Sequence, residues 1–493
     1  MEEECLMSSL PPEHPVDLSP QIEEALQSNP DEMILFLEDD STGVQKSHDV
    51  YLVTDYSKSG LSSGVRAARE AKHRLLFVLT NSRALSSRQA EALNRQIAQR
   101  LRGIAHAEGM TFRVGSRSDS TLRGYFPLEP LVLMKTLESG RDQFDGIIVS
   151  HAFLTEMGRI TVNRKHLLRV KKEDGSFWYR PVHLTRFAED ERFGYPTSDM
   201  AEYAEFKFAT SRLGTVKAGD VLHIDIDALR KGGPDQVRKT LLKAKNKQVI
   251  TLDVVNRRDL QVFVLGLLQA EREGKKFVYR SAASFPPARV NMTDKSVLDR
   301  EDILGSRAMA GNILCLWGSI VELSNVQLEI ALARIPDIEP IPFDVKRVLT
   351  AEKDRVDEIQ WTVKKTEDAF SAGKHAIVYT VPRTEYPSEK LSDEIRVINR
   401  QTIAAGLQEV FSQISIQPAV TIFKGGATSS TGLFGSGAKR VYVLGQIAPG
   451  IPIVRISPQD NERFPGKEML MVLGPGNVGG PTTYVEIFNK LAQ

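Results

Sequence analysis

The amino-acid sequence predicts an α/β protein with two domains, each an open, mostly parallel sheet with helices on both faces. Two observations support this prediction. After residue 30, short apolar runs alternate with amphipathic stretches along most of the chain, which is typical of parallel strands covered on both faces. The chain also has 493 residues, which is more than one hydrophobic core usually organises.

The first series of strands defines an N-terminal domain, which we place at residues 31–284. Its strands are predicted at 33–37, 75–79, 112–114, 146–150, 221–226, 249–254 and 276–279. Residues 155–215 interrupt the series with many charged and aromatic residues, so we expect an inserted or irregular region there. Residues 1–30 are acidic and proline-rich, and are predicted to be disordered or loosely packed.

A second series defines a C-terminal domain at residues 311–493. Its strands are predicted at 312–316, 375–380, 419–424, 440–444 and 469–473. Between the two domains, residues 285–310 show neither helical nor strand periodicity and contain Pro286-Pro287. We interpret this stretch as the linker.

The composition narrows the class of protein. Lys plus Arg number 64 and Asp plus Glu 63, a net charge of +1, which argues against nucleic acid or an anionic membrane as the main partner. Cys5 and Cys315 are the two cysteines, too few for a disulfide framework or a cysteine-based zinc site. The sequence shows no apolar run of membrane-spanning length and no recognisable targeting segment. We therefore expect a cytoplasmic protein.

Ligands of open parallel sheets bind beyond the carboxyl ends of the strands, so the residues after each apolar run are the informative ones. The run 33–37 is followed by Glu38, Asp39 and Asp40. Three consecutive carboxylates repel one another, so a metal ion, a group of donors or a substrate hydroxyl is expected to hold them. The alternative is a solvated acidic turn.

Arginines follow the neighbouring strands. Arg83 follows 75–79, and the loop after 112–114 carries Arg117, Ser118, Asp119, Ser120 and Arg123; Arg159 and His151 follow 146–150. Arginine at a strand end suits bidentate binding of a carboxylate or phosphate. The alternatives are a surface turn at Arg83, a helix cap at Ser118 or Asp119, and a structural role for His151. A cap requires neither Arg117 nor Arg123.

The second half of the chain carries small residues and hydroxyls at its strand ends instead. They are Ser319, Lys424, Gly425, Gly426, Ala427, Thr428, Ser429, Gly476, Asn477 and Gly479. Such residues let backbone N–H groups approach phosphate oxygens at a helix start; the alternative is a tight turn. The match of 474–479 to G-x-G-x-x-G is a weak signal for a nicotinamide-dependent dehydrogenase. An acid-binding half and a phosphate-binding half favour phosphoryl transfer.

The chain resembles the four-carbon acid sugar kinases, the family that includes threonate, erythronate and 3-oxo-tetronate kinases. The resemblance rests on DDSTGVQKSHDV (39–50), TNSR (80–83), SRSDSTLRGYFPLE (116–129), HAF (151–153), GRITV (158–162), WGS (317–319), KGGATSS (424–430), GQIAPGIP (445–452) and GPGNVGG (474–480). The resemblance implies an ATP-dependent kinase that phosphorylates a terminal hydroxyl of a small sugar acid. Its N-terminal domain would bind the acid and its C-terminal domain ATP.

The same resemblance implies where each ligand binds. The acceptor is expected at Asp39, Asp40, Arg83, Arg117, Ser118, Asp119 and Ser120, and ATP at Ser319, the segment 425–429, Gly476 and Gly479. This sequence departs from the family pattern in three places: EDDSTGVQ replaces DDDPTGTQ, Tyr125 replaces a usual His, and Thr431 replaces a usual Asp. The identity of the acid stays open.

For the mechanism, we expect Asp40, or else Asp39, to accept the proton of the acceptor hydroxyl. Mg²⁺ is expected to bridge the β- and γ-phosphates, and the sequence identifies no protein ligand for it. The alternative function is a non-catalytic sensor of sugar acids that has kept the fold. A homodimer is compatible with the sequence.

Overall fold

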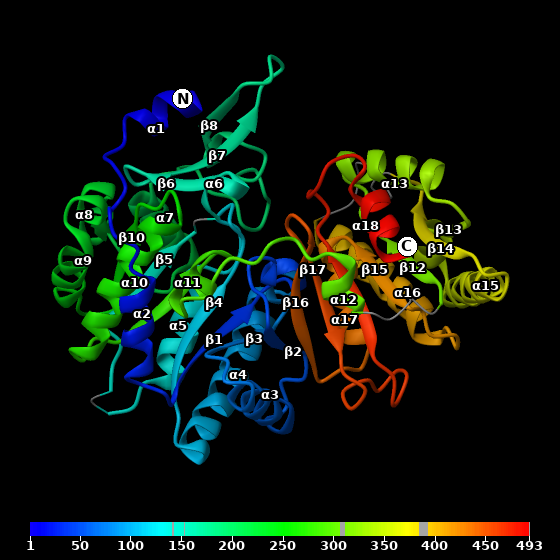
Figure 1. The fold of residues 1–493 in the computed structure, drawn as a ribbon, viewed down its shortest axis with the longest axis horizontal. Helices are drawn as coiled ribbons and strands as arrows, with labels where there is room; N and C mark the ends of the chain where they lie inside the picture. The colour runs from blue at the N-terminus through cyan, green and yellow to red at the C-terminus, as the bar shows by residue number, and fades with distance from the viewer. Residues whose placement is uncertain (141, 152, 306–310, 384–392, 493) are drawn as a thin grey trace. The chain divides into compact units, whose positions relative to one another are not determined.

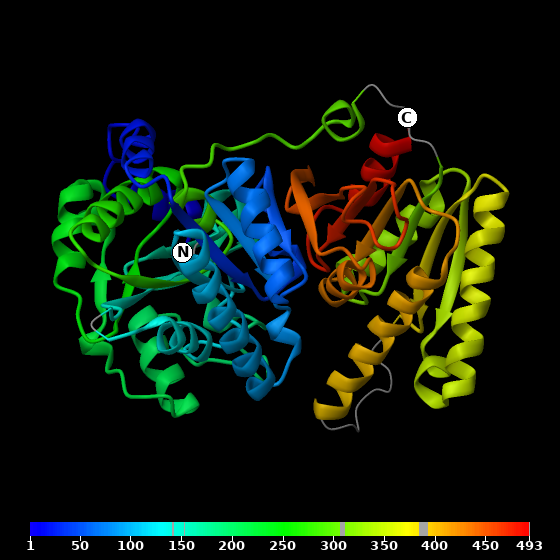
Figure 2. The same cartoon turned by 90° about the horizontal axis from the view of Figure 1, so that it is seen from below.

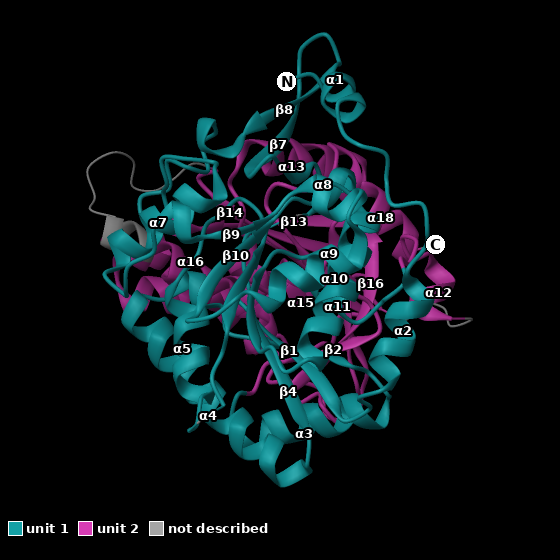
Figure 3. Cartoon of the chain, turned by 90° about the vertical axis from the view of Figure 1, so that its left-hand side faces the viewer, with its two compact units in different colours: residues 1–39, 56–293 teal, residues 40–55, 294–493 magenta. Residues whose placement is uncertain are grey.

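The structure is a computed structural model that describes residues 1–140, 142–151, 153–305, 311–383 and 393–492. Its contacts divide the chain into unit 1, Met1–Asp39 with Tyr56–Thr293, and unit 2, Asp40–Asp55 with Asp294–Gln493 (Figure 3). Ala152, in one of the matched motifs, and residues 306–310 of the predicted linker lie outside the described residues. Unit 2 therefore includes a short segment, residues 40–55, from the N-terminal part of the sequence.

Unit 1 is built on a parallel sheet with the strand order β3-β1-β4-β11-β5-β10-β9. The bounds are β1 Glu32–Glu38, β3 Leu75–Leu79, β4 Thr111–Arg117, β5 Gly146–Ser150, β9 Leu222–Ile224, β10 Gln248–Leu252 and β11 Phe277–Ser281. Phe36 on β1 packs against Phe77 and Tyr279. Strands covered on both faces need apolar residues at consecutive positions, which is why their sequences read as continuous apolar runs.

Helices lie on either side of this sheet (Figure 1). They are α2 Ser19–Gln27, α3 Lys58–Glu70, α4 Ser87–Glu108, α5 Leu128–Leu137, α7 Met200–Ser211, α8 Ile226–Arg230, α9 Gly233–Leu242, α10 Arg257–Arg272 and α11 Phe285–Arg289. Short 3₁₀ helices are η1 Ser41–Val44 (in unit 2), η2 Ser82–Ala84, η3 Val182–Leu184 and η4 Ala218–Asp220. Helix α4 begins with a capping box between Ser86 and Gln89, and Gly109, whose φ is +63°, caps its carboxyl end.

The irregular region predicted at 155–215 contains a small antiparallel sheet. It consists of β6 Arg159–Val162, β7 Lys165–Lys171 and β8 Phe177–Pro181, preceded by the short helix α6 Leu154–Met157 (Figure 1). Its strands were not predicted, because their charged residues obscure the apolar pattern.

The N-terminal 30 residues differ from the expectation of a disordered or loosely packed segment. They form α1 Glu3–Ser8 and α2, and α2 buries Ile22, Ala25 and Leu26. These three positions recur at the spacing of a helix face, and α2 packs against α10. Acidic and proline-rich composition hid this short amphipathic pattern.

Unit 2 has a mixed sheet with the strand order β13-β14-β12-β15-β18-β17-β16-β2. The bounds are β2 Val50–Val53, β12 Ile313–Trp317, β13 Ile338–Asp344, β14 His375–Val381, β15 Val420–Lys424, β16 Arg440–Ala448, β17 Ile451–Ile456 and β18 Met469–Gly474. The pairs from β13 to β18 are parallel, and those from β18 to β2 are antiparallel. Strands β2, β13 and β17 were not predicted. Strand β13 contains Pro340 and Pro342, which an edge strand tolerates.

The helices of unit 2 are α12 Arg300–Leu304, α13 Glu322–Arg334, α14 Val345–Thr350, α15 Glu352–Ser371, α16 Asp393–Gln413, α17 Gly426–Gly435 and α18 Thr483–Ala492. Figure 2 shows the long helices α15 and α16 beside the strands of this unit. Trp317 on β12 packs against Tyr484 on α18 in the core.

The predicted fold class is confirmed: both units are α/β, with a parallel sheet in unit 1 and a mostly parallel one in unit 2. Helices in the described parts of the chain are all too short or too polar to cross a lipid bilayer. The predicted domain limits remain predictions, although α11, at the start of the predicted linker, lies within unit 1.

Candidate functional site

The strand register of unit 1 aligns polar residues at the carboxyl end of its sheet. Glu38 on β1 pairs with Arg117 on β4, which pairs with Ser281 on β11, which in turn pairs with Ser150 on β5. The residues that follow these strands are Asp39, Ser118 and His151. The sheet therefore brings several residues predicted from the sequence to one edge.

Asp39 is buried at this edge with polar neighbours. Its Oδ2 accepts a hydrogen bond from Ser118 Oγ, and its Oδ1 lies 3.7 Å from Arg83 Nη2. Oδ1 has no hydrogen-bond partner among the described residues. Burial raises the pKa of Asp39 above its usual value, and the nearby Arg83 opposes this shift only in part. A buried carboxylate oxygen without a partner is a natural acceptor for a ligand hydroxyl.

Asp119 is the second acidic group next to Arg83. Arg123 Nε donates to Asp119 Oδ2 over 2.7 Å, Thr121 Oγ1 donates to the same oxygen, and Arg83 Nη1 lies 3.6 Å from Oδ1. Burial tends to raise the pKa of Asp119, but Arg123 and Arg83 outweigh it, so that the pKa lies well below its usual value. Arg83 thus lies between two carboxylates, both beyond hydrogen-bonding distance.

The other predicted residues of unit 1 have internal partners. Arg117 is buried and its Nη1 donates to Glu38 Oε1 over 2.8 Å. Arg159 donates to the carbonyl of Met157, and burial lowers its pKa. The carbonyl of Ser120 accepts from His166 Nε2 over 2.7 Å. These contacts link Arg117, Arg159 and Ser120 to neighbouring residues of unit 1, while Nε of both arginines is buried without a hydrogen-bond partner among the described residues.

One buried residue at this edge, Arg280, was missed from the sequence. Arg280 on β11 is completely buried and its Nη1 donates to Glu129 Oε2 over 2.6 Å. The signal was available, since Arg280 follows the apolar run 276–279 as the other candidates follow theirs. His151 is also buried, with its Nδ1 3.2 Å from the carbonyl of Asp119. Burial, together with Arg280, holds the pKa of His151 well below its usual value, so the ring is neutral.

Asp40 belongs to unit 2, unlike its neighbour Asp39. Its Oδ1 accepts from the backbone N–H and the hydroxyl of Thr42, at 2.9 and 2.8 Å, and so caps η1. Its Oδ2 lies 3.1 Å from the point that a Cβ on Gly426 would occupy. In addition, Ser430 Oγ donates to Ser41 Oγ over 3.0 Å. These contacts hold the Asp40 loop against the start of α17.

The loops of unit 2 bring backbone close to backbone at this helix start. Gly425, with φ +123°, connects β15 to α17, and its conformation disfavours any residue with a side chain. A Cβ on Gly476 would lie 2.9 Å from Ser319 Oγ. A helix start with closely approaching glycine loops offers backbone N–H groups to phosphate oxygens.

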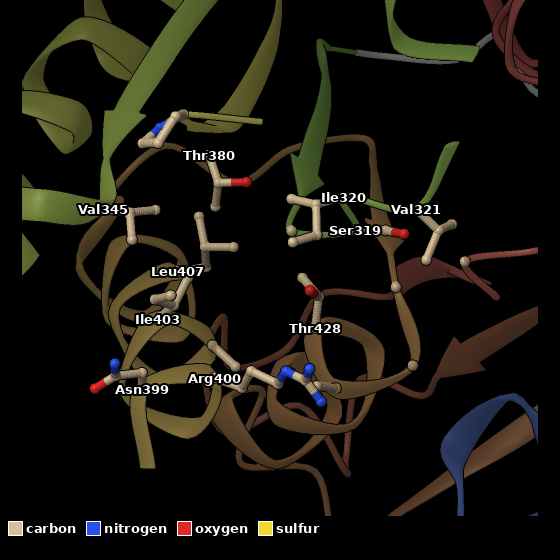
Figure 4. Close-up of a pocket in the computed structure, with 17 residues that line it drawn as sticks. Ser319, Ile320, Val321, Val345, Thr380, Asn399, Arg400, Ile403, Leu407 and Thr428 are labelled. Carbon is tan, nitrogen blue, oxygen red and sulfur yellow. The ribbon is translucent and has the colours of Figure 1, made fainter. Parts of the chain in front are cut away.

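A pocket of about 400 Å³ opens beside this helix start. Of the predicted nucleotide residues, it includes Ser319, Gly425, Gly426, Ala427, Thr428 and Gly476. Figure 4 shows the apolar side chains of Val345, Ile403 and Leu407 on one side, with Ser319 and Thr428 on the other. An apolar wall opposite hydroxyls and a helix N-terminus fits the base and the phosphates of a nucleotide. The apolar wall, which comes from α14 and α16, was not predicted.

Four predicted nucleotide residues, all in the described part of the chain, do not line this pocket: Lys424, Ser429, Asn477 and Gly479. Lys424 is buried, and its Nζ donates to the carbonyls of Pro475 and Gly476 over 2.7 and 3.2 Å. Burial lowers the pKa of Lys424 to about 7. Lys424 therefore connects β15 to the last glycine loop. The described residues include no cluster of His, Cys, Asp or Glu side chains that could hold a metal ion.

Two solved structures share this fold. A Haemophilus influenzae protein has 16% identity and a TM-score of 0.57, with 93% of this chain and 100% of that chain covered. A Salmonella typhimurium LT2 protein, described provisionally as a tRNA synthase, has 15% identity and a TM-score of 0.64, with 93% and 98% covered. At these identities the likeness extends to the fold alone. A search of curated proteins gave no match to the chain.

Family models match both parts of the chain. A sugar-binding N-terminal domain matches residues 34–289, and a nucleotide-binding C-terminal domain matches residues 314–484. The first match alone covers more than half of the 493 residues. The two matches correspond to the half with charged strand ends and the half with the glycine-lined pocket. The chain therefore belongs to the four-carbon acid sugar kinase family, which combines these two domains.

Proposed function

We propose that this protein is an ATP-dependent kinase that phosphorylates a small, four-carbon sugar acid on a terminal hydroxyl. The observation that supports it most is the contrast between the two strand-end sites. Unit 1 gathers Asp39, Arg83 and Asp119 in a sugar-binding domain. Unit 2 has a glycine-lined pocket in a nucleotide-binding domain. Acid recognition together with nucleotide recognition fits phosphoryl transfer.

Arg83 is the proposed partner of the substrate carboxylate. Its guanidinium nitrogens lie 3.7 and 3.6 Å from Asp39 and Asp119, longer than a charge-assisted hydrogen bond. A guanidinium at this edge of the sheet can bind a substrate carboxylate through two parallel N–H donors. Asp39 Oδ1 would then accept a hydrogen bond from a substrate hydroxyl, since burial leaves it without a partner among the described residues.

The residues around the pocket fit ATP. Val345, Ile403 and Leu407 would contact the base, and the backbone at the start of α17, with Thr428, would bind phosphate oxygens. Lys424 would keep the last glycine loop in place through the carbonyls of Pro475 and Gly476. Mg²⁺, when bound to the phosphates, would neutralise part of their charge.

In the proposed reaction the substrate hydroxyl oxygen forms a bond to the γ-phosphorus, and the bond from that phosphorus to the β–γ bridging oxygen breaks. The hydroxyl proton passes to a carboxylate, for which we propose Asp40. Asp40 lies beside Gly426 at the helix start expected to bind the phosphates. ADP leaves with the bridging oxygen. In this type of reaction the protein contributes mainly by positioning the groups and compensating their charge.

The direct test measures ADP release by the purified protein with ATP and Mg²⁺ over a panel of C4 to C6 aldonic and keto-aldonic acids. Melting temperatures with each acid alone are recorded in parallel. We expect ADP only with a subset of acids, and these should also raise the melting temperature. Acids that raise the melting temperature without ADP release would instead identify a sensor. No response to any acid in either assay would remove the proposed substrate class.

A further inference from the structure

A buried polar network lies beneath the charged residues of unit 1. Glu129 on α5 accepts hydrogen bonds from Ser82 Oγ, from Ser116 Oγ over 2.6 Å and from Arg280 Nη1 over 2.6 Å. Ser82 directly precedes Arg83, and Ser116 directly precedes Arg117. One buried carboxylate therefore connects the η2 turn, which carries Arg83, with strands β4 and β11.

Arg280 has hydrogen-bonding capacity that this network does not use. Its Nε and Nη2 have no hydrogen-bond partner among the described residues, although the side chain is completely buried. Buried donors without a partner cost free energy, so they call for an explanation.

The position of Gly124 shows where the unused donor points. A Cβ on Gly124 would lie 2.7 Å from Arg280 Nη2, 2.3 Å from Ser118 Oγ and 3.2 Å from Asp39 Oδ2. These three polar atoms surround one small space, which a glycine leaves open. Arg280 Nη2 thus lies near the Ser118–Asp39 hydrogen bond without itself having a hydrogen-bond partner among the described residues.

Stability alone does not explain such a pair. A buried ion pair is often no more stabilising than apolar side chains of similar volume. Its position close to Asp39 and to the turn of Arg83 suits a role in orienting these two side chains and in setting the charge around them.

We propose that Glu129 and Arg280 are a positioning pair for acid binding: Glu129 holds the turn that carries Arg83, and Arg280 fixes the Asp39–Ser118 hydrogen bond. This inference rests on the proposed function, because it assigns Asp39 and Arg83 to the sugar acid. Neither Glu129 nor Arg280 is proposed to touch the substrate.

The two members of the pair should act on Asp39 in opposite directions. The charged groups that face Asp39 are Arg83 on η2, Arg117 on β4, Glu129 on α5 and Arg280 on β11. The negative charge of Glu129 disfavours ionisation of Asp39, whereas the positive charge of Arg280 favours it.

The test is the pH dependence of acid binding, measured by calorimetry on the full chain with an acid from the panel above. We expect binding of the acid to weaken at low pH, as Asp39 becomes protonated, and we call this fall in affinity the acid limb. Arg280→Met should move the acid limb to higher pH and Glu129→Gln to lower pH, each by about one pH unit. Asp39→Asn should abolish the limb. Arg280→Lys keeps the charge, so its limb should stay near that of the unmodified protein while affinity falls.

Arg289→Met is the matched control. Arg289 is also completely buried and pairs with Glu271 over 2.7 Å, so its loss tests the effect of removing a buried cation elsewhere in unit 1. We expect a lower melting temperature and an unchanged limb. The proposal would be overturned if the acid limb moved in the same direction in Arg280→Met and Glu129→Gln. It would also be overturned if Arg289→Met moved the acid limb as far as Arg280→Met does.

If Glu129→Gln does not fold, Ser82→Ala provides the second variant, because it removes one contact to Glu129. Acid affinity should then fall about tenfold with ATP affinity unchanged. Equal binding of the acid by Ser82→Ala and the unmodified protein would contradict the role of Glu129. Because calorimetry reads binding without turnover, protein that binds acids but releases no ADP would refute the kinase function and leave this test valid.

Discussion

The two strand-end sites differ in the groups that they offer to the proposed ligands. Unit 1 offers side chains, with Arg83 between Asp39 and Asp119. Unit 2 offers backbone, at Gly425 and Gly426 where α17 begins. Fixed side-chain charges suit a small acid that offers one carboxylate and a few hydroxyls. Backbone N–H groups suit a flexible polyphosphate, because several of them converge at a helix start.

The adjacent residues Asp39 and Asp40 also differ in their surroundings, because they belong to different units. Asp39 is buried with Ser118 in unit 1, and Asp40 caps η1 beside Gly426 in unit 2. Two carboxylates joined by one peptide bond thus have separate surroundings. This separation favours separate roles, with Asp39 binding the acceptor and Asp40 accepting its proton.

The largest expected effect tests this separation directly. Asp40→Asn should lower kcat by roughly 10²–10⁴, with little change in ATP affinity, because it removes the proton acceptor and keeps the shape. Asp39→Asn should mainly raise the KM for the acid. Steady-state kinetics of both variants provides the comparison. A folded Asp39→Asn protein without turnover, beside an active Asp40→Asn protein, would exchange the two roles.

Asp39→Asn should also be at least as stable as the unmodified protein at neutral pH. Because the pKa of Asp39 is raised in the folded state, its favourable contribution is present at low pH and is lost as pH rises through that pKa. Melting temperatures at pH 5 and pH 8 check this sign.

Gly426→Val should have the next largest effect. A branched side chain at the start of α17 would meet Asp40 Oδ2 and occupy the space proposed for phosphate. ATP affinity should fall about a hundredfold while acid binding persists. Gly103→Val is the control, since a Cβ on Gly103 has no described atom within 4 Å. The measurement is calorimetry with ATP. Equal ATP affinity of the two variants would show that the nucleotide binds at another site.

Arg83→Ala should affect the other ligand. Losing one charge-assisted contact costs roughly 1.5–3 kcal/mol, which corresponds to about a ten- to hundredfold rise in the KM for the acid. The KM for ATP should change little. Arg95→Ala removes a partly exposed arginine on α4 that is paired with Glu91, and serves as the control. Equal rises in both KM values would show that Arg83 acts on a step common to the two substrates.

The last prediction concerns stability and not ligand binding, and its residue is Lys424. Because burial lowers its pKa to about 7, the unfolded chain binds a proton between about pH 7 and pH 10 that the folded protein does not. Stability should therefore rise with pH over this range, by at most about 1.4 kcal/mol per pH unit. In Lys424→Met this rise should disappear. The measurement is the difference in melting temperature between the two proteins from pH 7 to pH 10; a constant difference would contradict it.

The fold class follows from local patterns, because parallel strands covered on both faces need continuous apolar runs. Asp39, Arg83 and Ser118 could be predicted for the same reason: they follow such runs, and parallel strands end at one edge. Glu129 could not, since it lies within α5 and becomes relevant only through its contacts with Ser82, Ser116 and Arg280.

The pocket shows the same limit. Its glycine side follows from the sequence, because glycines and hydroxyls cluster after β15 and β18. Its apolar wall comes from helices, where Ile403 and Leu407 resemble ordinary core residues. The sequence also did not allow us to predict that residues 40–55 belong to unit 2. Their membership depends on pairing between β2 and β16, which are far apart in the sequence.

That pairing has a consequence for biosynthesis. Val50 on β2 pairs with Val443 on β16, so β2 leaves the ribosome long before its partner exists. Contacts between such distant residues form slowly, because a long chain must first be closed into a loop. The sheet of unit 2 can be completed only when most of the protein has been synthesised. A fragment that starts at residue 294 would lack β2 and leave the edge of β16 exposed, which favours aggregation.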